Sequence, residues 1–167
     1  MNIISIKPVD GINGPGVRCS IWIAGCNNKC EGCWSPKTWN PNQGKSFKNS
    51  IKEIILDISN INIDGVAILG GDPFYYIMNG IDSELLDLLL IIKNNLKNNQ
   101  NIWLWTGYTL DEIKANPLAY QCFKLVDFAV INRFELDKRD LTLPFRGSSN
   151  QQIINCNTLE DITSQYK

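Results

Sequence analysis

Four short apolar runs recur along the chain, at residues 17–24, 65–69, 101–105 and 125–131. Each is bounded by turn-forming residues and is rich in branched or aromatic side chains, which is typical of buried β-strands. Residues 2–7 alternate more weakly between apolar and polar and form a further candidate strand, as do residues 152–155 near the C-terminus.

The segments between these runs show helical periodicity. Residues 47–58 place apolar side chains at Phe47, Ile51, Ile54, Ile55 and Ile58, which predicts an amphipathic helix. Residues 83–96 repeat this pattern with leucines and isoleucine, and Ser83 is a candidate N-cap. Thr109 and Glu112 form a capping box for a short helix that Asn116-Pro117 ends.

The order of strand, loop and helix repeats along the chain, which predicts an α/β fold with a parallel sheet and right-handed crossovers. Four to five strands are too few for a closed eight-stranded barrel. We therefore expect a partial (β/α) barrel or an open, mostly parallel sheet. In such sheets ligands bind at the carboxyl ends of the strands.

Length and composition restrict the class of protein. The 167 residues, 44% of them hydrophobic, suit one domain spanning residues 1–167. A net charge of −1 disfavours direct nucleic-acid binding. No apolar run approaches the ~20 residues of a membrane span, and the N-terminus lacks a signal-peptide pattern, so we expect a cytoplasmic protein. The absence of histidine excludes a histidine base or a Cys2His2 zinc site.

The most informative motif is a group of three cysteines directly after the strand predicted at residues 17–24. Cys26, Cys30 and Cys33 follow a C-x3-C-x2-C spacing. Thiolates at such spacing bind zinc or iron–sulfur clusters. Structural zinc and ordinary [4Fe-4S] clusters both take four ligands, whereas three thiolates on a four-iron cluster leave one iron open to a small molecule.

Two other interpretations of these cysteines stay open from the spacing alone. A zinc site could be completed from elsewhere, with Cys156 as the best candidate for the fourth ligand, or the thiols could be inert core residues. Cys19 alternates with Ile21 and Ile23, which indicates a structural role.

A second candidate loop follows the strand at residues 65–69. It reads Gly70-Gly71-Asp72-Pro73, and two glycines at a strand end let a ligand approach the backbone closely. Asp72 can either fix the loop or accept a hydrogen bond from an ammonium group. A simple turn is the alternative.

Together the two loops resemble those of the radical S-adenosylmethionine (radical SAM) superfamily. There, three cysteines hold a [4Fe-4S] cluster whose open iron binds S-adenosylmethionine, and a Gly-Gly-Glu/Asp-Pro loop holds the amino group of that cofactor. The resemblance implies Cys26, Cys30 and Cys33 as metal ligands. It implies cofactor contacts within two segments, at Gly32, Cys33, Trp34, Gly70, Gly71, Asp72 and Pro73. Thr106 is added from its place after the strand at residues 101–105.

Over nearly its full length the chain resembles one family of this superfamily, the activating components of anaerobic ribonucleoside-triphosphate reductase. The matching segments are residues 8–10, 13–16, 25–33, 38–39, 70–73, 103–108 and 146–151. Many radical SAM enzymes carry an aromatic residue before the third cysteine, where this chain has Gly32. The family's Val-Asp-Gly-x-Phe also differs here, because Ile131 and Asn132 stand between Val130 and Arg133-Phe134.

The resemblance implies a truncated radical SAM fold and an oxidoreductase activity. One electron from the cluster would cleave S-adenosylmethionine to methionine and a 5′-deoxyadenosyl radical, which would take a hydrogen atom from a glycine of the large reductase subunit. A flavodoxin- or ferredoxin-like protein would supply the electron. An activase of another glycyl-radical enzyme, such as formate acetyltransferase, and a non-enzymatic zinc-binding module remain as alternatives.

One charged segment, residues 133–140, has no assigned role. Its mixed signs are typical of a solvated loop, and a docking surface is the alternative.

Overall fold

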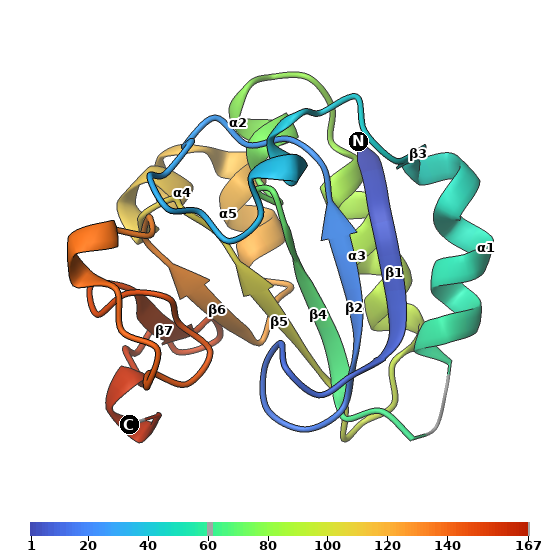
Figure 1. Ribbon diagram of the computed structural model, residues 1–167. Coiled ribbons are helices and arrows are strands. Elements are labelled where there is room, and N and C mark those ends of the chain that lie inside the picture. Colours follow the sequence, from blue (N-terminus) through green and yellow to red (C-terminus); the bar gives the residue numbers. More distant parts are fainter. Residues whose placement is uncertain (60–61, 167) are drawn as a thin grey trace.

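The computed structural model describes residues 1–59 and 62–166. Within these residues seven strands form one sheet, in the order β3-β1-β2-β4-β5-β6-β7 (Figure 1). The central strands are parallel to one another and comprise β2 (Arg18–Ile23), β4 (Gly65–Gly70), β5 (Asn101–Trp105) and β6 (Phe128–Ile131). The predicted α/β class with an open, mostly parallel sheet is confirmed.

The remaining strands are antiparallel to their neighbours and flank the parallel centre. They are β1 (Asn2–Asp10), β3 (Lys45–Ser46) and β7 (Gln152–Asn155). The sheet is therefore larger than the four to five strands expected. The two residues of β3 are too few to carry a periodic signal, so only their pairing with β1 defines them.

Three helices cover one face of the sheet (Figure 1). They are α1 (Phe47–Ile58), α3 (Glu84–Asn95) and α5 (Pro117–Phe123). Two shorter helices, α2 (Tyr75–Met78) and α4 (Leu110–Ala115), follow β4 and β5. The buried faces of α1 and α3 are those that the periodicity predicted.

The helix ends differ partly from the predictions. The capping box of Thr109 and Glu112 is present. Asn116 does end α4, but its side chain also accepts from the backbone of Leu118 and Ala119, so the same residue begins α5, which the sequence did not predict. The Ser83 side chain forms no cap. Asp82 Oδ1 instead accepts from the Glu84 N–H at 3.0 Å.

The two faces of β2 have different neighbours. Cys19, Ile21 and Ile23 belong to the core between the sheet and the helices, so the structural role predicted for Cys19 is confirmed. Trp22, one residue out of phase, lies on the opposite face and lines a cavity. The chain after β6 packs against that face, where the C-terminal Tyr166 contacts Trp103.

The helices that the structure describes are too short to cross a bilayer. The longest, α1 and α3, have 12 residues each, well below the ~20 of a membrane-spanning helix.

Candidate functional site

The cysteine loop lies where β2 ends, at the carboxyl edge of the parallel strands. Its first residues are hydrogen-bonded to the 3-10 helix η1 (Pro36–Trp39). Gly25 N–H donates to Thr38 O at 2.7 Å, and Cys26 N–H donates to Trp39 O at 3.2 Å. Cys26 is buried, whereas Cys30 and Cys33 are half-buried. Cys26 is therefore the least accessible of the three.

The backbone contributes to the surroundings of the sulfur atoms. Ser35 N–H donates to Cys33 Sγ at 3.4 Å, and the backbone of Phe134, from the loop after β6, opposes the rise that burial gives to the pKa of Cys30. Burial, with Asp72 nearby, raises the pKa of Cys26 to about 11, so this thiol is protonated until a metal binds. Hydrogen bonds to the sulfurs of a cluster stabilise their negative charge and set its reduction potential.

The thiols of the cysteine loop do not surround a single point in the structure. Within residues 1–59 and 62–166, no three cysteine, aspartate or glutamate side chains gather closely enough to hold one metal ion. Thiolates on one tetrahedral zinc lie within about 4 Å of one another, because each Zn–S bond is about 2.3 Å long. A four-iron cluster is larger than one ion and holds its thiolates farther apart.

Cys156 does not complete a zinc site with the cysteine loop. It follows β7, whose last residue Asn155 pairs with Phe128 at the start of β6. The cysteine loop lies at the other end of the parallel strands, about 10 Å or more away along β6. Cys156 is fully buried, and its N–H donates to Asp127 O at 3.0 Å. The proposed fourth ligand is therefore a core residue.

The second predicted loop, residues 70–73, lies directly beside the first. Gly71 N–H donates to Ile23 O at 2.7 Å, and Asp72 N–H donates to Gly25 O at 2.8 Å. A Cβ on Gly71 would lie 2.3 Å from Gly25 O, so only glycine allows this approach. Two loops that are some 45 residues apart in sequence are thus joined backbone to backbone, as their positions at neighbouring strand ends predicted.

Asp72 connects this loop to the one after β5. The carboxylate is 2% exposed. It accepts from Thr106 Oγ1 at 2.9 Å, from Gly107 N–H at 2.8 Å and from Phe74 N–H at 3.0 Å. Burial raises its pKa to about 6, and the donors oppose that rise. Of the two roles expected for Asp72, fixing the loop is the one that the structure displays.

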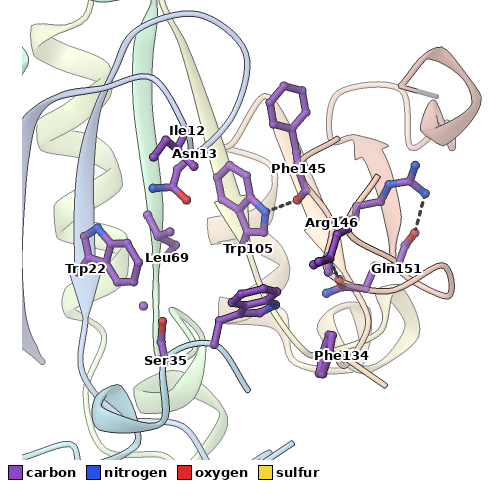
Figure 2. Close-up of a pocket in the computed structure, with 15 residues that line it drawn as sticks. Ile12, Asn13, Trp22, Ser35, Leu69, Trp105, Phe134, Phe145, Arg146 and Gln151 are labelled. Carbon is purple, nitrogen blue, oxygen red and sulfur yellow. Dashed lines mark hydrogen bonds between the residues drawn. The ribbon is translucent and has the colours of Figure 1, made fainter. Parts of the chain in front are cut away.

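A cavity of about 420 Å³ opens on the sheet face that the helices leave free (Figure 2). This is within the range of roughly 300–1,000 Å³ usual for small-molecule sites. Gly70 and Gly71 form part of its wall, and the predicted contact Trp34 also lines it. Figure 2 shows Trp22, Leu69 and Trp105 side by side on the strands, with Arg146 and Gln151 across the cavity.

Several lining residues were not predicted as site residues. Trp22 and Trp105 were assigned only to strands, although their tryptophan side chains alternate out of phase with the core residues of the same strands. That alternation was the available signal. Arg146 comes from a loop far along the chain, and no local pattern places it at the cavity. Its Nη2 donates to Tyr166 O at 2.9 Å.

The charged segment 133–140 is mostly exposed, as expected for a solvated loop, but it also contacts the cysteine loop. A Cβ on Gly32 would lie 2.7 Å from Leu136 Cδ1, and Arg139 lies over the Trp34 ring. The turn into this segment occurs at Asn132, whose φ of 75° is in the left-handed region. Asparagine tolerates that region better than other non-glycine residues, so it can replace the family's glycine.

Comparison with known proteins gives a consistent match. Residues 12–154 match the family described as a 4Fe-4S single cluster domain. The anaerobic ribonucleoside-triphosphate reductase-activating proteins of Pasteurella multocida strain Pm70 and Escherichia coli strain K12 are each 35% identical, over 92% of this chain and 96% and 97% of their own lengths. The activating protein of Enterobacteria phage T4 is 36% identical over 92% of this chain and 93% of its own. The chain belongs to this family of activating proteins.

The residues present fit the single 4Fe-4S cluster of the family. Three thiols are available on one loop, and the other cysteines, Cys19, Cys122 and Cys156, are all fully buried in the core. The donor set is therefore three sulfurs, one of them accepting from the Ser35 N–H, near a cavity that has Gly70 and Gly71 in its wall. This arrangement suits a cluster with one iron free to bind a small molecule.

Proposed function

We propose that the chain acts in the cytoplasm as a radical SAM activase, one domain over residues 1–167, that generates a glycyl radical on anaerobic ribonucleoside-triphosphate reductase. The observation that best supports this is the pair of backbone hydrogen bonds from Gly71 and Asp72 to Ile23 and Gly25, which joins the two loops beside the cavity that Gly71 lines. It brings a three-thiol metal site next to a glycine-rich wall that a small polar ligand can approach.

Cys26, Cys30 and Cys33 hold the [4Fe-4S] cluster in this proposal. S-adenosylmethionine lies against two loops, contacting Gly32, Cys33 and Trp34 in the first and Gly70, Gly71, Asp72 and Pro73 in the second. It also contacts Thr106, which follows β5. When bound, these cofactors supply one-electron cleavage of S-adenosylmethionine, and a glycine hydrogen atom ends on 5′-deoxyadenosine while methionine is released.

The chain's own residues bind, orient and exclude water. The Ser35 N–H stabilises the charged sulfur of Cys33. Trp22 and Trp105 give the cavity apolar walls. No general base is required for transfer of a hydrogen atom, which agrees with a chain that contains no histidine.

Two protein partners follow from this reaction. The large subunit of the reductase carries the glycine that loses its hydrogen atom, and a flavodoxin- or ferredoxin-like protein supplies the electron. Both belong to the proposal, since the names of the relatives refer only to the reductase.

Anaerobic iron–sulfur reconstitution, reduction and addition of S-adenosylmethionine test the first half of the proposal. We expect brown protein that forms 5′-deoxyadenosine, and no product from Cys30→Ala. Colourless protein with bound zinc and no cleavage would overturn the enzyme assignment and favour a zinc-binding module.

The partner is tested separately. The reduced, loaded protein is mixed with the large reductase subunit or with formate acetyltransferase, and the glycyl radical is detected by electron paramagnetic resonance. A signal on the reductase alone supports the proposal. A signal only on formate acetyltransferase would keep the chemistry and change the partner.

A further inference from the structure

The Asp72 carboxylate has a fourth hydrogen-bond donor, and it comes from the cysteine loop. Asn28 Nδ2 donates to Asp72 Oδ2 at 3.2 Å. Oδ2 also accepts from Gly107 N–H, while Oδ1 accepts from Phe74 N–H and Thr106 Oγ1. Each carboxylate oxygen offers about two acceptor positions. All of them are therefore in use within the protein, and a ligand ammonium could bond Asp72 only by displacing one of these donors.

Asn28 is the member of this set that connects the cysteines to the rest of the site. It lies two residues after Cys26 and two before Cys30. Among the described residues no lysine or arginine forms an ion pair with Asp72, so the buried charge depends on these four donors. A hydrogen bond to a charged, buried acceptor is stronger than one between neutral groups.

The glycine after Thr106 makes room for this contact. A Cβ on Gly107 would lie 2.2 Å from Asn28 Nδ2. The amide of Asn28 therefore occupies the space above Gly107, pressed between that backbone and the carboxylate. The middle of the cysteine loop is therefore held both by this steric fit and by the hydrogen bond to Asp72.

We propose that Asn28 and Asp72 are positioning residues, which hold the cysteine loop at a fixed place relative to the Gly70–Gly71 backbone. The inference rests on the proposed function, because its consequence is the alignment of a cluster on one loop with a cofactor held by the other. Asp72 acts by joining the two loops, and Asn28 acts by fixing the position of the cysteines on either side of it.

The test compares Asn28→Ala with Asn27→Ala. Asn27 is the preceding residue of the same loop, and its amide donates to Asn79 Oδ1 at 2.9 Å, away from Asp72. Both variants are reconstituted with iron under anaerobic conditions. Three quantities are measured: iron content, melting temperature, and the change in the electron paramagnetic resonance spectrum of the reduced cluster as S-adenosylmethionine is titrated.

We expect Asn28→Ala to keep its iron, with a melting temperature a few degrees below that of Asn27→Ala because one donor to the buried carboxylate is lost. The S-adenosylmethionine concentration that gives half of the spectral change should rise about tenfold in Asn28→Ala and stay unchanged in Asn27→Ala. Asp72→Asn should show the same shift, and the double variant should be no worse than the more affected single variant.

Two results would overturn the inference. Equal titration midpoints for Asn28→Ala and Asn27→Ala would show that the contact does not align the site. Loss of iron from Asn28→Ala would show that Asn28 retains the cluster instead of orienting it. If the unsubstituted protein forms no 5′-deoxyadenosine, the proposed function fails first, and that result is independent of both variants.

Discussion

The guanidinium carbon of Arg139 lies 4.7 Å from the ring centroid of Trp34. Trp34 is 62% exposed and follows the third cysteine, so without this contact its indole would have little to hold it. A cation over an aromatic face is attracted by the negative π-surface, with about 0.5–1 kcal/mol at exposed sites. Arg139 thus lies against a tryptophan that also lines the cavity.

Removing the charge of Arg139 should weaken cofactor binding without unfolding the protein. We expect Arg139→Gln to raise the KM for S-adenosylmethionine about two- to fivefold, which corresponds to a contact of this strength, with kcat nearly unchanged. Lys138→Gln is the matched control, since Lys138 pairs with Glu135 and does not lie over the ring. Equal KM values for the two variants would contradict the role assigned to Arg139.

Substitution of single cysteines should separate cluster ligands from core residues. Cys30→Ala should lose both the brown colour and the formation of 5′-deoxyadenosine. Cys156→Ala should keep both, because this thiol is buried at the amino end of the parallel strands. Absorbance after reconstitution and product assay measure the two effects. A folded but colourless Cys156→Ala protein would indicate that Cys156 helps to hold the cluster and would contradict its assignment as a core residue.

The cysteines of the metal-free protein should differ in their reactivity toward an alkylating reagent. Burial raises the pKa of Cys19 and of Cys122 to about 12, so at about pH 8 only one molecule in about 10,000 carries either thiolate. The thiolate fraction rises with pH, but burial also blocks the reagent. We expect Cys30 and Cys33 to be alkylated first, with mass spectrometry of peptides as the measurement.

Unfolding provides the control for that experiment. In denaturant all of the thiols should react at similar rates, because both burial and the raised pKa are lost. Rapid alkylation of Cys122 in the folded protein would show that the helix-side core opens more readily than its complete burial indicates.

A methyl group on Gly107 should disturb the cysteine loop, although the two are far apart in the sequence. Its Cβ would lie 2.2 Å from Asn28 Nδ2, so Gly107→Ala should cost about 1–3 kcal/mol of unfolding free energy. Each kcal/mol lowers the melting temperature by about 2–4 °C in a chain of this size. Gly11→Ala is the control, since nothing lies within 4 Å of its Cβ position.

The cause of that destabilisation can be checked with a second substitution. Asn28→Ala removes the atom that the new methyl group would meet, so the double variant should lose less stability than the sum of the single variants. Strict additivity would mean that Gly107 acts through some other contact.

The sequence was sufficient for the parts of the fold that depend on local pattern. The apolar runs and helical periodicity predicted the four central strands and the helices α1 and α3. The placement of both candidate loops at strand ends predicted that they would meet, since parallel strands share one carboxyl edge. The capping box at Thr109 was also recognisable, because it is a local interaction.

Contacts between distant segments were not predictable in the same way. Leu136 lies against Gly32 across more than 100 residues of chain, and the turn that directs it there depends on the left-handed conformation of Asn132. A mixed-sign segment carries no periodic signal that distinguishes a free loop from one packed on a site. The donors that fill Asp72 come from three separate loops, so only their spatial arrangement reveals its role.

The open edges of the sheet affect how large a substrate can reach the site. The active site of a closed barrel is reached from the end of the barrel where the strands terminate. Here β3 and β7 stand at opposite ends of the strand order and do not pair with each other. The reacting edge can therefore be approached from the side by a loop that remains attached to a folded macromolecule at both of its ends. This geometry suits a substrate that is one residue within another protein.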